Sequence, residues 1–362
     1  MAELKSDERS VTLAIDAMGG DAGPQAVIEG VAHARARGMN ADIVFFGDRE
    51  TLAPLLEKTG GARDEIHHTD AVVAMTDKPS HVIRRGRNTS MWGAVERLAG
   101  GGADAAVSCG NTGALMAVSR LQLRMIEGVD RPAITALWPT PRGRSVVLDV
   151  GANVEADEKQ LVQFAIMGEA FYRALTGVEK PTVGLLNVGA EDLKGHELIR
   201  TAARVLREAD PEMAFKGFVE GNDISNGAVD VVVTDGFTGN IALKTAEGAA
   251  RLVGSWVKEA LTGTINAKFG SIFMRPGLMK LKDRIDPSSN NGGVFLGVNG
   301  LVVKSHGGAD ARGVSSAVRM AADLARHPFR DDVAKTVNAV MQRRDTLSGA
   351  ADSPNPMVKE AV

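Results

Sequence analysis

The stretch VTLAIDAMGGDAGPQAVIEGVAHARARG, residues 11–38, contains the pattern that decides the fold. It begins with a short apolar run, Val11–Ala17, which is typical of a buried strand. A glycine-rich turn follows, and behind Pro24 the apolar residues recur at helical spacing as far as Gly38. The stretch therefore predicts a strand, a glycine turn and a helix, in that order.

The same order recurs along the rest of the chain. Apolar runs that end in polar or glycine-rich turns lie at Asp42–Phe46, Asp104–Ser108, Ser145–Val150, Thr182–Val188, Phe215–Glu220 and Val229–Thr234. Several of these runs are continuously apolar, as expected of strands that helices cover on both faces. The sequence therefore predicts an α/β fold, a three-layer α/β/α sandwich with a mostly parallel sheet.

One antiparallel pair is predicted near the end of the sheet. The apolar runs Gly293–Val298 and Leu301–Val303 are separated by Asn299-Gly300, which is a strong signal for a two-residue hairpin turn. The sheet is therefore expected to be mixed. We expect residues 11–330 to form a single domain.

The composition excludes several classes of protein. The 362 residues carry 42 Lys and Arg against 45 Asp and Glu, a net charge of −3, so no general basic field favours nucleic acid. The single cysteine excludes an intramolecular disulfide and suits a reducing cytoplasm. We expect no secretory signal and no membrane-spanning segment, because no apolar stretch reaches the roughly 18–20 residues that a span needs.

A basic and apolar excursion lies around residues 263–284. Its core, Lys268–Arg284, holds five basic residues against Asp283 alone, a local charge of +4, with apolar residues interleaved. Such a segment suits an anionic membrane surface or an acidic protein partner. The alternative is an ordinary helix pair packed on a dimer mate. Residues 1–10 and 344–362 lack an apolar period and are expected to be flexible tails.

The loop SCGNTGA after the third predicted strand is a candidate phosphate site. Ligands of such sheets gather beyond the carboxyl ends of the strands. Asn111, Thr112 and Gly113 stand at a helix start, where free N–H groups and the helix dipole attract an anion. The alternative is that Asn111 or Thr112 only caps the helix.

Other loops supply charged candidates. Lys194, Lys304 and His306 follow predicted strands and are expected to face one crevice, where they would bind a dianion. A solvated lysine is the alternative for each lysine. The carboxylates of Asp16 and Asp235 would orient these cations, cap helices or hold Mg²⁺.

Several familiar motifs fail on inspection. The glycines of GGDAG, residues 19–23, lack the GxGxxG spacing, so no dinucleotide is predicted. His196–Arg200 departs from HExxH at its last position, and no zinc or other metal site is predicted. Ser108 lacks the first glycine of GxSxG, and Cys109 is better explained as a small buried residue than as a nucleophile.

Taken in order, the loops closely resemble one family, the bacterial phosphate acyltransferases that convert fatty acyl-carrier protein and orthophosphate into acyl phosphate. The resemblance runs from about Val11 to Arg330. It rests on IDAMGGD, on DKP with the following RR and SM, on SCGNTGALMA, DVGAN, LLNVGAEDLKG and GFVEGND, on DVVVTDGFTGN with Lys244, and on GVFLGVNGLVVKSHG. Each motif is short, but their joint occurrence in this order is highly specific.

The resemblance implies a fold similar to that of isocitrate and isopropylmalate dehydrogenases and of phosphotransacetylase. It also implies a homodimer in the cytoplasm, peripherally associated with the membrane, without an organic cofactor. A membrane-bound acyl-phosphate:glycerol-3-phosphate acyltransferase would consume the product. The acidic carrier protein would dock on Arg84 and Arg85, or on the basic excursion.

Phosphate is already partly dianionic near neutral pH, so positioning it against the thioester matters more than a strong base. We expect Asn111, Thr112, Lys194 and either Lys304 or His306 to bind phosphate. The amides of Asn187, Asn240 or Asn153 would donate to the tetrahedral oxyanion. A covalent acyl-enzyme is the lesser alternative, because no Ser or Cys has a base at a recognisable spacing.

Three rival functions remain open from the sequence. A phosphotransacetylase-like enzyme would act on acyl-coenzyme A and need neither a carrier protein nor a membrane. A metal-dependent decarboxylating dehydrogenase would need clustered Asp ligands and a nicotinamide site, and neither has a fingerprint in this sequence. A non-catalytic tether would explain the basic excursion but would leave the glycine-rich loops without a role.

Overall fold

The computed structural model describes residues 10–264, 273–275, 277–278, 292–327 and 330–351. The strands in this part of the chain are β1 (Thr12–Asp16), β2 (Asp42–Gly47), β3 (Glu65–His68), β4 (Ala105–Ser108), β5 (Ala133–Thr140), β6 (Gly143–Leu148), β7 (Thr182–Leu186), β8 (Ala214–Val219), β9 (Val231–Val233), β10 (Gly293–Leu296) and β11 (Leu301–Lys304). They form one sheet in the order β3-β2-β1-β4-β11-β10-β5-β6-β9-β7-β8.

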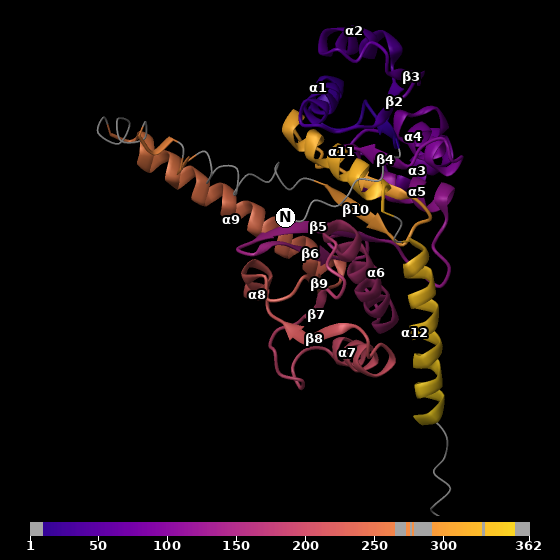
Figure 1. Cartoon of the computed structure of the whole chain (residues 1–362), viewed down its shortest axis with the longest axis vertical. Helices are drawn as coiled ribbons and strands as arrows, with labels where there is room; N and C mark the ends of the chain where they lie inside the picture. The colour runs from indigo at the N-terminus through magenta and orange to yellow at the C-terminus, as the bar shows by residue number, and fades with distance from the viewer. Residues whose placement is uncertain (1–9, 265–272, 276, 279–291, 328–329, 352–362) are drawn as a thin grey trace, which may run out of the picture.

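Helices cover both faces of this sheet, so the predicted three-layer sandwich is confirmed (Figure 1). On one face lie α1 (Gly23–Ala36), α2 (Arg49–Thr59), α6 (Glu158–Thr176), α7 (Glu197–Ala209), α11 (Ala311–Ala325) and α12 (Arg330–Ala351). On the other lie α3 (Pro79–Arg85), α4 (Ser90–Ala99), α5 (Thr112–Leu123), α8 (Gly221–Asn226) and α9 (Gly236–Thr262), with the short 3-10 helix η1 (Gly86–Asn88) between α3 and α4.

The sheet consists of two parallel groups that run in opposite directions. Strands β3, β2, β1, β4 and β11 are mutually parallel, and so are β6, β9, β7 and β8. Between them, β11–β10, β10–β5 and β5–β6 all pair antiparallel, and three such pairings in a row invert the direction. The carboxyl ends of the two groups therefore lie at opposite edges of the sheet.

This inversion bears on the cations that the sequence predicts to face one crevice. Lys194 follows β7 and Lys304 ends β11, so their loops leave the sheet at opposite edges, and the strand order alone does not bring the two lysines together. The predicted hairpin is confirmed as β10 and β11, and every predicted strand is present. Strands β3 and β5 were not predicted, and β5 makes two of the three antiparallel pairings that together invert the direction.

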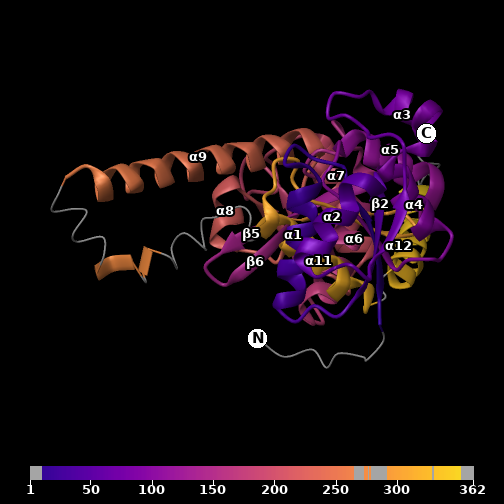
Figure 2. The same cartoon turned by 90° about the horizontal axis from the view of Figure 1, so that it is seen from above.

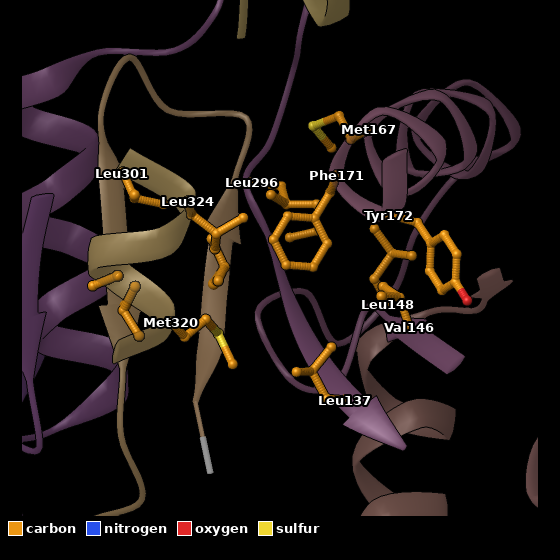
Figure 3. Packing of buried hydrophobic residues seen from close by; sticks show 14 of the residues in the cluster. Leu137, Val146, Leu148, Met167, Phe171, Tyr172, Leu296, Leu301, Met320 and Leu324 are labelled. Carbon is orange, nitrogen blue, oxygen red and sulfur yellow. The ribbon is translucent and has the colours of Figure 1, made fainter. Parts of the chain in front are cut away.

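A continuous hydrophobic core joins the two groups of strands. Figure 3 shows α11 and β10 facing β5, β6 and α6 across this core, with Leu296 and Met320 from one side and Leu148 and Phe171 from the other. Phe171 and Leu148 are fully buried. Truncating either of these side chains to alanine is therefore expected to cost about 2–5 kcal/mol of stability.

Helix α9 extends far beyond the sheet, as Figure 2 shows. Of its described residues, only Gly236 and Gly239 are fully buried. No helix in the described part of the chain is long and apolar enough to cross a membrane. Most of the basic excursion lies outside the described residues. Helix α12 continues to Ala351, past the predicted start of the C-terminal tail at residue 344.

Candidate active site

The loops that follow β1, β4 and β11 pack tightly against one another. The Asp21 N–H donates to the carbonyl oxygen of Gly307 at 2.8 Å. A Cβ atom at Gly20, where φ is +98°, would lie 2.9 Å from Cβ of Cys109 and 3.0 Å from the Gly307 carbonyl. Glycine is therefore required at this position, and the glycine-rich turn after β1 serves to bring three loops together.

Two ionisable side chains are buried beneath these loops, Asp16 (1% exposed) and Lys304 (6% exposed). Burial raises the pKa of Asp16, although a 2.7 Å hydrogen bond from the Ser108 hydroxyl opposes the rise. The Lys304 ammonium donates to the carbonyl oxygens of Cys109, at 3.4 Å, and Ser305. Burial lowers the pKa of Lys304 to about 8. The negative charge of Asp16 favours the charged form of the Lys304 amine.

Both polar atoms of the Asn111 side chain form hydrogen bonds within the protein. Its Oδ1 accepts from the Ala114 N–H at 3.0 Å and so caps α5. Its Nδ2 donates to the carbonyls of Met75 and Asp77, both at 2.9 Å. Asn111 thus holds the loop before α3 against the start of α5, and Thr112 and the exposed Gly113 form the first turn behind it.

The loop after β6 is organised by Asp149, which is fully buried. Its carboxylate accepts the N–H groups of Gly151, Ala152 and Asn153 at 2.7–3.2 Å, together with one from β5. The first turn of α9 rests on this loop, and a Cβ atom at Gly239 would lie 2.0 Å from the Asp149 carbonyl oxygen. The contact fixes where α9 begins.

One face of α9 meets the loop after β11. The Asn240 side chain lies over Gly151, with its Cγ 3.6 Å from where a Cβ of that glycine would be. One and three turns further on, Lys244 and Arg251 act electrostatically on His306. Burial, followed by the charge of Lys244, lowers the pKa of His306. We name Lys244, Arg251, Lys304 and His306 the cation cluster; two of its members lie on α9, and the other two lie at the end of β11 and in the loop that follows.

The neighbouring face of α9 lines a cavity of about 1820 Å³. The α9 residues in its wall are Phe237, Thr238, Ile241, Ala242, Thr245, Ala246 and Ala249. Three predicted site residues, Asn153, Asn187 and Asp235, also line it. One face of α9 therefore contributes to the cation cluster, and the neighbouring face lines a largely apolar cavity.

Two of these lining residues form hydrogen bonds within the protein. The Asn153 amide donates to the carbonyl of Pro132 at 2.7 Å and to the Asp149 carboxylate at 2.9 Å. Asp235 caps α9, because its carboxylate accepts both the N–H and the hydroxyl of Thr238, at 2.8 and 2.9 Å. Capping was one of the alternatives that the sequence left open for Asp235.

The loop after β7 is built around Asn187. Its amide donates to the carbonyls of Gly189, at 3.2 Å, and Lys194, at 3.1 Å, and these carbonyls fix which amide atom is the nitrogen. The Lys194 ammonium is exposed and pairs with Glu191 at 2.9 Å. The hydrogen bond that the Lys194 ammonium donates to the Glu191 carboxylate raises the pKa of Lys194 and so favours the charged amine.

Comparison with known proteins shows the family to which this chain belongs. A family model described as "Fatty acid synthesis protein" matches residues 11–331. A phosphate acyltransferase from Maricaulis maris is 55% identical over 88% of this chain and 92% of its own length. Another, from Paramagnetospirillum magneticum, is 52% identical over 96% of this chain and 98% of its own length. The chain belongs to the phosphate acyltransferase family. It is therefore an enzyme, an acyltransferase.

Solved structures confirm the fold of this acyltransferase. A phosphotransacetylase from Streptococcus pyogenes aligns over 87% of this chain and 94% of its own, with a TM-score of 0.59 and 16% identity. A second phosphotransacetylase, from Staphylococcus aureus, aligns over the same shares with a TM-score of 0.56 and 15% identity. At such identities the likeness concerns the fold alone.

The two arginines predicted to dock the carrier protein lie apart from the cavity lining. Arg84 and Arg85 end α3 and are exposed, and the Arg84 guanidinium donates to the Ser80 carbonyl at 3.1 Å. The sequence analysis missed Asp149 as the organiser of the acyltransferase's central loop. A signal was present, because an Asp that ends a buried strand before Gly-Ala-Asn faces several N–H groups that need an acceptor.

Proposed function

We propose that this acyltransferase moves a fatty acyl group from the thioester of acyl-carrier protein to orthophosphate, giving acyl phosphate and free carrier-protein thiol. The observation that carries the proposal is the arrangement of α9. One face contributes to the cation cluster, and the next lines a large cavity with an apolar wall. An anion and an acyl chain would thus be held on adjacent sides of one rigid element.

The proposed reaction is a direct displacement. A phosphate oxygen attacks the thioester carbonyl carbon, the C–S bond breaks in the tetrahedral intermediate, and the thiolate leaves and takes up a proton. Lys304, His306 and Lys194 supply positive charge for phosphate, with Thr112 and Gly113 at the start of α5. Among the three predicted oxyanion donors Asn240 is preferred, because it is exposed while Asn153 and Asn187 donate to the protein.

The reaction is tested by following free thiol from palmitoyl-carrier protein with and without orthophosphate, while hydroxylamine traps acyl phosphate. The expected result is thiol release that requires phosphate, together with equimolar hydroxamate. Release without phosphate would contradict the proposal. Turnover of acyl-coenzyme A in place of acyl-carrier protein would favour the phosphotransacetylase-like alternative.

The pH dependence follows from Lys304. The groups that act on its amine are Cys109, Asp16, Asp21 and, from α9, Lys244, and burial dominates over all of them. Because the pKa is about 8, the amine loses its charge as pH rises through that value. We expect kcat/KM for phosphate to fall above about pH 8, since a charge-assisted contact to phosphate is lost.

The control is Lys304→Arg, whose guanidinium keeps its charge to above pH 12. The variant should retain measurable activity without the decline near pH 8. A decline that is the same in both proteins would assign it to another group. Initial rates at subsaturating phosphate between about pH 6.5 and 9.5, roughly 1.5 pH units on either side of the Lys304 pKa of about 8, give the profile.

The same proposal includes partners. We propose a cytoplasmic homodimer that contacts the membrane peripherally, docks acyl-carrier protein on Arg84 and Arg85 or on the basic excursion, and passes acyl phosphate to a membrane-bound glycerol-3-phosphate acyltransferase. Exposed apolar side chains support a covered or membrane-facing surface, since Trp256 is 58% and Phe273 87% exposed.

A further inference from the structure

We infer that the cavity beside α9 measures the acyl chain, with Ala242, Ala246 and Ala249 setting how many carbons fit. The inference rests on the proposed function, because it takes the fatty acyl group as the occupant. It adds a set of specificity-determining residues to the site. The polar and the apolar parts of the cavity lie at different places along α9.

The polar end of the cavity is next to the reacting groups. Asn153 and Asn187 line it there, and Thr238 stands in the first turn of α9. Asn153 belongs to the Asp149 loop over which Asn240 lies, and Asn187 is bonded to the Lys194 carbonyl. A thioester placed at this end would lie beside the Asp149 loop, over which Asn240 lies, and beside the loop that carries Lys194.

The apolar part extends away from this end along two elements at once. On α9, the distance from Thr238 to Ala249 is eleven residues, or about 16 Å along the axis. On β5, the Ile134 N–H donates to the Asp149 carboxylate. Trp138 lies four residues further along the strand, a distance of about 13 Å. Helix and strand therefore delimit an elongated space whose far part is lined by apolar side chains.

Small side chains keep the helix wall of this space open. Ala242, Ala246 and Ala249 recur at intervals of four and three residues, so they lie on one face of α9. All three line the cavity. Each successive alanine is thus about one turn further from the polar end, and a bulky residue at each would close the space at a different depth.

The opposite wall is fixed by Trp138. Its indole is buried, with 8% exposure, and its Nε1–H donates to the Ser225 hydroxyl of α8 at 3.1 Å. Ile224 beside it is fully buried. Because packing and a hydrogen bond hold this wall in place, the wall cannot move aside easily. The length available to the acyl chain is therefore defined.

An extended saturated chain is the occupant that these features favour. Apart from Thr245, the α9 residues that line the cavity beyond Thr238 are apolar, and the end lined by Asn153 and Asn187 is where α9 begins. Each methylene that enters is removed from water, so excluding several of them discriminates strongly between chain lengths.

The test compares kcat/KM for octanoyl-, lauroyl- and palmitoyl-carrier protein in Ala242→Phe, Ala246→Phe and Ala249→Phe. We expect Ala249→Phe to lower only the palmitoyl value, Ala246→Phe the palmitoyl and lauroyl values, and Ala242→Phe all three. Each affected value should fall by about tenfold or more relative to wild type. Ala250→Phe, one residue along α9 and outside the cavity lining, is the matched control and should keep the wild-type profile.

The outcomes separate the two proposals. If the wild-type enzyme releases no thiol with any chain length, the proposed function fails. If it is active but the three variants share one profile, or match Ala250→Phe, the chain-length inference is overturned. Circular dichroism and thermal melts of each variant identify a folding defect, and Ala→Leu at the same positions, which adds less bulk, then gives the same order of cut-offs or refutes it.

Discussion

Lys194→Ala is expected to lower kcat for phosphate-dependent thiol release by at least about 100-fold, the usual cost of removing one charged donor from a transition state. The side chain is exposed and pairs only with Glu191 among its described contacts, so folding should be little affected. Such exposed pairs contribute about 0–1 kcal/mol to stability. The large loss should therefore fall on kcat and leave the melting temperature nearly unchanged.

The control for this variant is Lys216→Ala, which removes an exposed lysine on β8 outside the cavity lining. It should keep kcat within about twofold of wild type, as surface substitutions usually do. Lys194→Arg retains the charge and should restore part of the rate. Equal activity of Lys194→Ala and Lys216→Ala would remove Lys194 from the mechanism.

Gly239→Ala is expected to destabilise the protein by about 3 kcal/mol and to abolish most activity. The added Cβ would lie 2.0 Å from the Asp149 carbonyl oxygen, a backbone atom that has no rotamer with which to move aside. Overpacking of this kind costs about 1–3 kcal/mol, sometimes more. The start of α9 must shift, and Asn240 shifts with it.

The matched control lies nine residues further along the same helix. A Cβ atom at Gly248 would meet nothing within 4 Å. Gly248→Ala should therefore stabilise the protein by about 0.5–1 kcal/mol, because alanine is the better helix former. Urea denaturation of both variants measures the change in the free energy of unfolding. If both substitutions changed it in the same direction, the contact of Gly239 with the Asp149 loop would not be what holds the start of α9.

Much of the fold was predictable because its signals are local. Apolar runs and glycine turns identified the strands, and Asn299-Gly300 identified the β10–β11 hairpin. The opposed direction of the two strand groups was not predictable in this way. It depends on β5 pairing with β10, which is more than 150 residues away, and nothing local in the sequence encodes that choice.

The loop positions of the candidate site residues were predictable from the sequence, but their hydrogen-bond partners were not. The predicted Asn111, Asn153 and Asp235 all lie at the expected loops, yet each is bonded within the protein. A sequence shows that an amide stands at a helix start, but not which carbonyls fold back onto it. The cavity was missed for the same reason, since α9 and Trp138 meet only in three dimensions.

The way α9 is attached has a mechanical consequence. A helix of 27 residues is about 40 Å long, and its fully buried positions, Gly236 and Gly239, are both in the first turn. Beyond them, Ala242, Leu243 and Ala246 are only partly buried against the core. Any tilt of the helix about its first turn would therefore displace Trp256 much further than Asn240, which lies four residues from Gly236.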